Sequence, residues 1–205
     1  FGEGKMSSPR QIYKYLKNYF NNKNIVKKKN WKAIVTTGPT REYIDPVRYI
    51  SNESSGKQGC EVAIALNKLG IKTTLISGPS SLVFPKDLKV KKITSADEML
   101  NEVKKSLPAD LVVCAAAVTD FKPTENNKNK IKKEAIKLQK INFVKNYDIL
   151  EYVSKNNKHR PRLVAGFSAE TENVINNSVS KMKKKNCDII FANDVSQKDV
   201  GFNSD

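Results

Sequence analysis

Short apolar runs alternate with amphipathic segments along most of the chain, and this alternation limits the folds open to it. The apolar runs lie at residues 33–37, 73–76, 90–93, 111–118, 163–167 and 188–192. Segments with helical spacing of apolar residues lie between them, at 54–69, 95–107 and 171–185. Strands that alternate with helices form parallel sheets with right-handed crossovers. The pattern therefore predicts an α/β fold with a doubly wound, mostly parallel sheet and helices on both faces.

The chain is long enough for one domain with its own core, since it has 205 residues. Residues 8–20 show helical spacing of apolar side chains, and residues 21–30 are polar and charged, as in a linker. The alternation of strands and helices begins after them, at Trp31. We therefore expect one boundary, between residues 1–30 and a domain formed by residues 31–205.

The charge of the chain is strongly positive. It has 37 lysines and arginines against 21 acidic residues, which gives a formal net charge of +16. Such a charge is typical of proteins that bind nucleic acid, acidic membranes or polyanionic small molecules. The lysine runs at 27–29 and 183–185 lack interleaved aromatic residues, which a nucleic-acid site would be expected to have. We therefore expect solvated charge and no nucleic-acid partner, and keep a basic nucleic-acid-binding module as an alternative.

The sequence indicates neither a membrane-spanning helix nor a zinc site or disulfide framework. No apolar run approaches the roughly 20 residues that a membrane helix needs, so we expect no membrane partner. Cys60, Cys114 and Cys187 have neither zinc-site nor disulfide spacing. They are typical of reduced core residues in a cytoplasmic protein.

Residues 37–59 carry the clearest functional signal. A Gly/Pro turn follows the first strand, and a Ser/Gly cluster at 54–59 opens the next helix. In a parallel sheet, ligands bind where such turns collect, at the carboxyl ends of the strands. A helix N-terminus also favours anions through its free N–H groups and its macrodipole. The stretch therefore predicts a ligand that carries phosphate.

Other kinds of chemistry lack the residues that they need. The one histidine, His159, lies in a polar turn, so a nucleophilic triad is not expected. The chain has no P-loop motif and no G-x-G-x-x-G after its first strand. The polar, basic segment 121–136 interrupts the alternation, and loops of that length are commonly functional or disordered. What remains is phosphate chemistry, with lysines and one or two carboxylates for magnesium.

Several blocks of the sequence resemble one known family. Residues 37–59, 77–79, 115–121, 130–133, 166–171, 192–195 and 201–205 are similar, in this order, to phosphopantothenoylcysteine synthetase. This enzyme is the second activity of a bifunctional flavoprotein of coenzyme A biosynthesis. The resemblance implies a Rossmann-like fold, with residues 1–30 as the tail of a preceding decarboxylase domain plus a linker. It also implies that 31–205 is the synthetase domain with its C-terminal end truncated, and that FMN belongs only to the absent decarboxylase domain.

The resemblance further implies the reaction and its partners. The carboxylate of 4′-phosphopantothenate attacks the α-phosphate of CTP, pyrophosphate leaves, and an acyl-cytidylate forms. The amine of L-cysteine then displaces CMP to give the amide. Mg²⁺ is implied as the cofactor, bound mainly through the triphosphate, so no protein ligands for it are assigned. A homodimer fused to the decarboxylase is also implied.

The residues that match the family's site fall into three groups. The catalytic candidates are Asn52 and Lys130, since a neutral amide and a cation can both stabilise a developing oxyanion. The nucleotide-binding candidates are Gly38, Ser54, Gly56, Gly59, Asp120, Lys130, Tyr147, Asp148, Ile149, Leu150, Phe167, Lys181, Lys185 and Asn193. The phosphopantothenate-binding candidates are Asn52, Ala116, Ala117, Asp120 and, from the partner protomer, Arg48.

One further alternative is a nicotinamide-dependent oxidoreductase of Rossmann-like topology. Such an enzyme is expected to have a compact glycine fingerprint after the first strand and an acidic residue after the second. Here the second strand ends in Ser77-Gly78-Pro79. This interpretation is therefore disfavoured.

Overall fold

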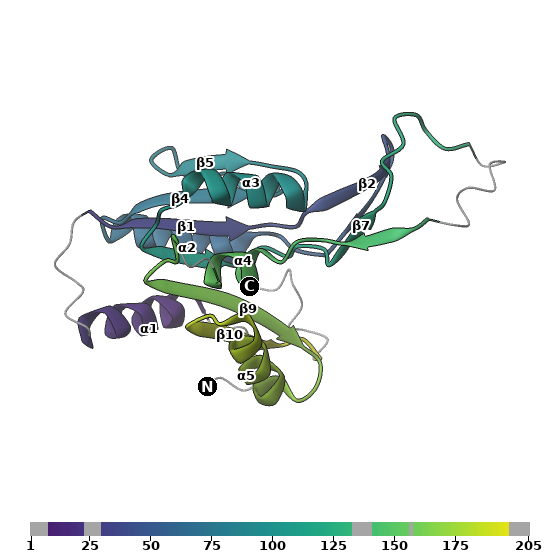
Figure 1. Ribbon diagram of the computed structural model, residues 1–205. Coiled ribbons are helices and arrows are strands. Elements are labelled where there is room, and N and C mark those ends of the chain that lie inside the picture. Colours follow the sequence, from purple (N-terminus) through teal and green to yellow (C-terminus); the bar gives the residue numbers. More distant parts are fainter. Residues whose placement is uncertain (1–7, 23–29, 133–140, 156–157, 197–205) are drawn as a thin grey trace.

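The computed structural model describes residues 8–22, 30–132, 141–155 and 158–196, and its centre is a six-stranded parallel sheet (Figure 1). The strands lie in the order β10-β9-β6-β1-β4-β5. Their bounds are Lys32–Thr37 (β1), Lys72–Ser77 (β4), Lys89–Lys92 (β5), Leu111–Cys114 (β6), Leu163–Glu170 (β9) and Ile189–Asp194 (β10). The chain winds outward from β1 in one direction and from β6 in the other, which is the doubly wound order. The predicted fold is confirmed.

Helices cover both faces of the sheet because alternate residues of each strand point to opposite sides. Ala33 and Val35 of β1 join one apolar cluster, with side chains of α1 and α2. Ile34 joins a second cluster on the other face, with α3 and α4. The helices span Pro9–Asn22 (α1), Lys57–Lys68 (α2), Ala96–Ser106 (α3), Ile149–Ser154 (α4) and Val174–Lys185 (α5). No helix within the described residues has the length and apolar composition to cross a membrane.

Helix α1 belongs to the same core as the residues that follow it. Ile12 and Leu16 are almost fully buried, and both lie in the cluster that contains Trp31 and residues of α2 and β9. The helix predicted at 8–20 is thus confirmed, and it covers part of the sheet. The assignment of residues 1–30 to the tail of another domain stays a prediction, but α1 packs as part of this core.

Several predicted elements have different ends in the structure, and two of these differences lie next to the predicted site. The helix expected from residue 54 begins at Lys57, because Gly56 has φ 79°, a left-handed conformation that stops the helix there. The strand expected over 111–118 ends at Cys114. Beyond it the backbone still follows the extension of β1, since Ala117 N donates to Gly38 O at 2.9 Å and Pro39 bridges Ala117.

Two antiparallel pairs of short strands were not predicted. Strands β2 (Arg41–Asp45) and β3 (Arg48–Ser51) form a hairpin directly after β1. Strands β7 (Phe121–Pro123) and β8 (Phe143–Lys145) pair with each other, and β2 contacts β7. In Figure 1, β2 and β7 extend together beyond the end of the central sheet. The segment 121–136, expected to be loop, therefore begins with a strand, and its last residues, 133–136, lie outside the described residues.

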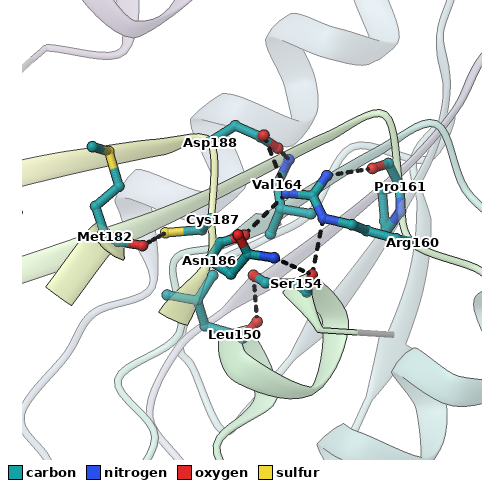
Figure 2. Close-up of polar contacts among 9 residues, drawn as sticks. All are labelled: Leu150, Ser154, Arg160, Pro161, Val164, Met182, Asn186, Cys187 and Asp188. Carbon is teal, nitrogen blue, oxygen red and sulfur yellow. Dashed lines mark hydrogen bonds and ion pairs between the residues drawn. The ribbon is translucent and has the colours of Figure 1, made fainter. Parts of the chain in front are cut away.

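A guanidinium holds the amino edge of the sheet together, on the side away from the turns that follow the strands (Figure 2). Arg160 donates to Ser154 O at the end of α4 (2.9 Å), to Asn186 O after α5 (3.0 Å) and to Asp188 Oδ1 (3.1 Å). The other oxygen of Asp188 accepts from Val164 N at 2.7 Å. Arg160 thus joins two helix ends to Asp188, the residue before β10, and Asp188 in turn holds β9.

We expect Arg160→Met to destabilise the fold by about 1.5–3 kcal/mol, since the hydrogen bonds from a charged group to two carbonyls and to Asp188 are lost. The measurement is urea unfolding. The matched control is Arg162→Met, whose guanidinium pairs with Asp110 at 3.3 Å from a side chain that is 62% exposed. The control should lose less than about 1 kcal/mol. Equal losses would show that the contacts in Figure 2 contribute no more than a surface ion pair.

Candidate active site

Glycines allow the backbone to close tightly where β1 ends. A Cβ on Gly56 would lie 3.1 Å from Gly38 Cα, and a Cβ on Gly59 would lie 2.5 Å from Thr37 Oγ1. Thr37 Oγ1 donates to Gly56 O at 2.6 Å, which fixes the start of α2 against β1. The predicted nucleotide-binding residues Gly38, Gly56 and Gly59 are therefore brought together, and their small size serves this packing.

The Ser/Gly cluster also forms hydrogen bonds of its own at the start of α2. The hydroxyl oxygens of Ser54 and Ser55 accept from the N–H groups of Gly56 and Lys57, each at 3.3 Å. Ser55 O in turn accepts from Ser80 Oγ at 2.8 Å. Part of the donor set expected to hold phosphate is thus used within the loop.

Four of the predicted phosphopantothenate residues, all except Arg48, lie at the extension of β6. The side chain of Asn52 is exposed and donates to Val118 O at 3.0 Å. Ala116 and Ala117 precede that carbonyl, and the exposed Asp120 follows it. Asn52, from the β2–β3 side, is therefore beside the strand end that carries the other candidates.

A buried polar network, missed from the sequence, supports this edge. Thr40, Glu42, Thr119 and Asn146 are all less than 7% exposed, far from one another in the chain, and joined. Thr119 N and Thr119 Oγ1 lie 3.2 and 3.3 Å from Thr40 Oγ1. Thr119 Oγ1 also donates to Glu42 Oε1 at 3.4 Å, and Asn146 Nδ2 donates to Thr119 O at 2.8 Å. The network fixes Thr119 and Asn146, the residues that directly precede Asp120 and Tyr147.

Glu42 also links the hairpin to a helix. Its Oε1 accepts from Ala96 N at 2.8 Å, in the first turn of α3. A carboxylate at this position is stabilised by the free N–H groups and the macrodipole of the helix. Sequence reasoning had no signal for this, because Glu42 looks like an ordinary charge in a polar stretch.

The segment 147–150, predicted to bind nucleotide, forms the start of α4. Asn146 N donates to Asp120 O at 2.8 Å, so the two predicted regions touch. Asp148 caps the helix by accepting from Glu151 N at 2.7 Å. Tyr147 is exposed, whereas Ile149 and Leu150 are buried in the apolar cluster on that face.

The two predicted lysines of α5 already have partners. Lys181 Nζ donates to Phe167 O at 3.0 Å, near the carboxyl end of β9. Lys185 Nζ lies 2.9 Å from Asp148 Oδ2 and 2.7 Å from Glu151 Oε2, and its side chain is only 13% exposed. A phosphate bound by Lys185 would therefore have to compete with two carboxylates.

Phe167 and Asn193 lie on neighbouring strands at this end of the sheet. The ring of Phe167 stacks at 5.1 Å from that of Phe191. Asn193, on β10, is 9% exposed, and its Oδ1 is buried without a hydrogen-bond partner among the described residues. An unpaired buried acceptor costs about 1–3 kcal/mol, so a donor at Asn193 would be stabilising.

Lys130 and Arg48 are placed together, on the projecting part of the molecule. Arg48 Nη2 donates to Ile131 O at 2.8 Å, and its guanidinium pairs with Asp45. This partner lowers the pKa of Asp45 well below its usual range. Lys130 itself is exposed. The sequence placed both residues in loops, and no signal linked the two.

The described residues offer little for a metal ion or a thiol nucleophile. They contain no group of three or more His, Cys, Asp or Glu side chains that could hold a metal. Mg²⁺ is commonly held by one or two carboxylates plus substrate phosphates, and the exposed Asp120 fits that pattern. All three cysteines are free, and burial raises the pKa of Cys114 to about 12, so this thiol stays protonated.

Comparison with known proteins identifies the family. Residues 28–205 match the DNA/pantothenate metabolism flavoprotein C-terminal domain family. The chain belongs to this family. The resemblance found in the sequence blocks is therefore confirmed.

One relative is the Coenzyme A biosynthesis bifunctional protein CoaBC of Haemophilus influenzae, which is 42% identical over 205 residues. The match covers 100% of this chain and 50% of that protein, so the chain spans about half the length of this relative.

Two solved structures share the fold. The C-terminal domain of a CoaBC protein aligns with a TM-score of 0.68 and 34% identity, over 78% of this chain and 75% of that one. A Cab2 H337A mutant in complex with phosphopantothenate-cysteine aligns with a TM-score of 0.65 over 91% of this chain and 79% of that one. Its identity of 15% supports likeness of fold alone.

We expect the contribution of Glu151 to stability to depend on pH. Hydrogen bonds from Lys155 and Lys185 lower the pKa of Glu151 from 4.5 to about 2. A carboxyl whose pKa is lowered in the folded state stabilises the fold above its unfolded pKa, and this effect is lost as the pH falls through the folded value. Glu151→Gln should therefore destabilise at pH 7, by less near pH 3, and by little or nothing below pH 2. Urea unfolding at each pH is the measurement, and a constant difference would contradict the assignment.

Proposed function

We propose that the chain is a phosphopantothenate–cysteine ligase, which joins 4′-phosphopantothenate to L-cysteine with CTP as the activating nucleotide. The observation that carries the proposal is the match of the whole chain to half of a CoaBC protein. The complex of the Cab2 mutant with phosphopantothenate-cysteine, on the same fold, agrees with it. The proximity of Asn52 to the segment that carries Ala116, Ala117 and Asp120 supports a shared site for the two substrates at the carboxyl ends of the strands.

The proposed reaction has two steps that this edge suits. The carboxylate of 4′-phosphopantothenate attacks the α-phosphate of CTP and pyrophosphate leaves. The amine of cysteine then attacks the acyl carbon and CMP leaves. Both steps build negative charge on oxygen, which positioned donors and cations stabilise. The exposed amide of Asn52 and the ammonium of Lys130 are the groups we assign to that role.

The triphosphate end is assigned to the cationic side of the site. Lys130 and Lys181 would contact phosphate oxygens, with the segment 147–150, Phe167 and Asn193 around the base and ribose. When bound, Mg²⁺ would neutralise charge on the triphosphate, with Asp120 as its protein carboxylate.

We further propose that the active form is a homodimer, in which Arg48 reaches the substrate of the partner protomer. Exposed apolar side chains on the projecting strands support this, since Tyr49, Phe121, Phe143 and Val144 are each more than 40% exposed. Arg48 is already oriented by Asp45, with 36% of its side chain exposed.

We also propose that a flavin-dependent decarboxylase is fused to this domain in a cytoplasmic protein, with FMN bound there. The half-length match to a bifunctional relative supports the fusion. The nicotinamide and nucleic-acid interpretations are not favoured by any relative.

The test is the release of CMP and pyrophosphate from CTP by the purified protein. In steady state, we expect release of both to need 4′-phosphopantothenate and cysteine together, with a product of the mass of 4′-phosphopantothenoylcysteine. Parallel reactions with ATP test the choice of nucleotide. No release from either nucleotide with both substrates present would refute the ligase, and release from ATP alone would refute the assignment of CTP.

We expect Asn52→Asp to keep CTP affinity within about threefold and to slow product formation by about 10²–10³-fold, since a carboxylate cannot donate to the developing oxyanion. The acyl-cytidylate should accumulate, as detected by quenched-flow mass spectrometry. Asn101→Asp, on the exposed face of α3, is the control and should behave as the unchanged protein. Loss of CTP binding in Asn52→Asp would instead make Asn52 a structural residue.

A further inference from the structure

Asp45 is a fully buried carboxylate on a hairpin that projects from the sheet. It is the last residue of β2, and its exposed fraction is 0%. Acidic side chains are almost never fully buried unless they are paired. The groups that surround this carboxylate therefore indicate what it does.

The two oxygens of Asp45 serve different parts of the chain. Oδ1 accepts from Val47 N and Arg48 N, both at 2.9 Å, which is the local pattern that closes a turn. Oδ2 accepts from Arg48 Nε at 3.0 Å and from Ile131 N at 3.2 Å. Ile131 lies 86 residues further along the chain. The second oxygen is thus used to hold a distant segment.

The hairpin holds that segment on both sides of Lys130. On one side, the Asp45–Arg48 pair contacts both the N–H and the carbonyl of Ile131. On the other side, Asn127 N donates to Ile44 O at 3.1 Å. Between these anchors the side chain of Lys130 is exposed. The backbone is fixed while the ammonium group remains available to a ligand.

We infer that Asp45 is a positioning residue for the reaction: its Oδ2, together with Arg48, fixes the backbone at Ile131 and so places Lys130 for the nucleotide. The role in catalysis rests on the proposed function of Lys130, whereas the hold on the backbone does not. A segment fixed in advance loses less conformational entropy when a ligand binds.

The variant Asp45→Asn tests the roles of the two oxygens separately. The amide oxygen can still accept from Val47 and Arg48 and keep the turn. The amide nitrogen would then face the guanidinium and Ile131 N, which are donors, so the hold on the distant segment is lost. The matched control is Asp110→Asn, because Asp110 also accepts a backbone N–H, from Lys32 at 3.0 Å, and pairs with an arginine, Arg162. Asp110 lies at the amino edge of the sheet.

The first readout is hydrogen–deuterium exchange of the full chain, which needs no substrate. We expect exchange in a peptide that covers residues 127–131 to rise about tenfold or more in Asp45→Asn and to stay unchanged in Asp110→Asn. Peptides from β10 should be unchanged in both. If Asp45→Asn does not fold, the double variant Asp45→Asn with Arg48→Gln, which also removes the half-exposed cation left without its carboxylate, takes its place. Unchanged exchange at 127–131 in a folded variant would overturn the inference.

The second readout is kinetic. We expect Asp45→Asn to raise the KM for CTP about tenfold and to leave the KM for cysteine unchanged, since only the placement of Lys130 is altered. Lys130→Gln should raise the same KM by at least as much, and adding Asp45→Asn to it should cause little further change. Additive effects of the two variants would overturn positioning through Lys130. If the unaltered protein shows no ligase activity, the proposed function fails, while the exchange result still decides whether Asp45 holds the segment.

Discussion

The close approach of backbones at the end of β1 is the constraint on which the rest of the site depends. Gly78 passes so near Pro39 that a Cβ there would lie 1.7 Å from the carbonyl oxygen of Pro39. The start of α2 is fixed to the same strand end by Thr37, as is the extension of β6 through Ala117. The turn after β4, the start of α2 and the extension of β6 therefore all contact the end of β1, at the point where strand order reverses and α/β folds bind ligands.

From this junction the chain leaves the sheet twice, and both excursions carry candidate residues. The β2–β3 hairpin starts from the end of β1, and the β7–β8 pair starts from the end of β6. Their bases are joined by the buried Thr40–Glu42–Thr119 network, and their outer parts by Asp45 and Ile131. A side chain on either pair is thus fixed relative to the sheet through polar contacts, because the pairs add little apolar surface to the core.

The sheet could be predicted from the sequence, whereas the projecting pairs could not. Runs such as residues 111–114 are apolar because both faces of a central parallel strand are covered, and this leaves a clear signal. β2 reads Arg-Glu-Tyr-Ile-Asp, with polar residues where a half-buried strand would have apolar ones. Its inward side chains, Glu42 and Asp45, are buried by hydrogen bonds to distant segments, and no local pattern encodes such partners. For the same reason the family resemblance predicted Lys130 but not the residue that holds its backbone.

Two of the lysines predicted to contact phosphate, Lys185 and Lys130, differ in the surroundings of their ammonium groups. Lys185 is neutralised by Asp148 and Glu151, so phosphate binding there would require exchange of partners that already hold α4 to α5. The free energy gained by such an exchange is only the difference between the new ion pair with phosphate and the existing ion pairs with the carboxylates. Lys130 is exposed, on a backbone fixed by other groups, and among the described residues its ammonium would not have to give up a carboxylate to meet a phosphate. Of these two lysines, Lys130 is therefore the one whose attraction to a triphosphate would contribute in full under the proposed function, and the position of its backbone would matter correspondingly more.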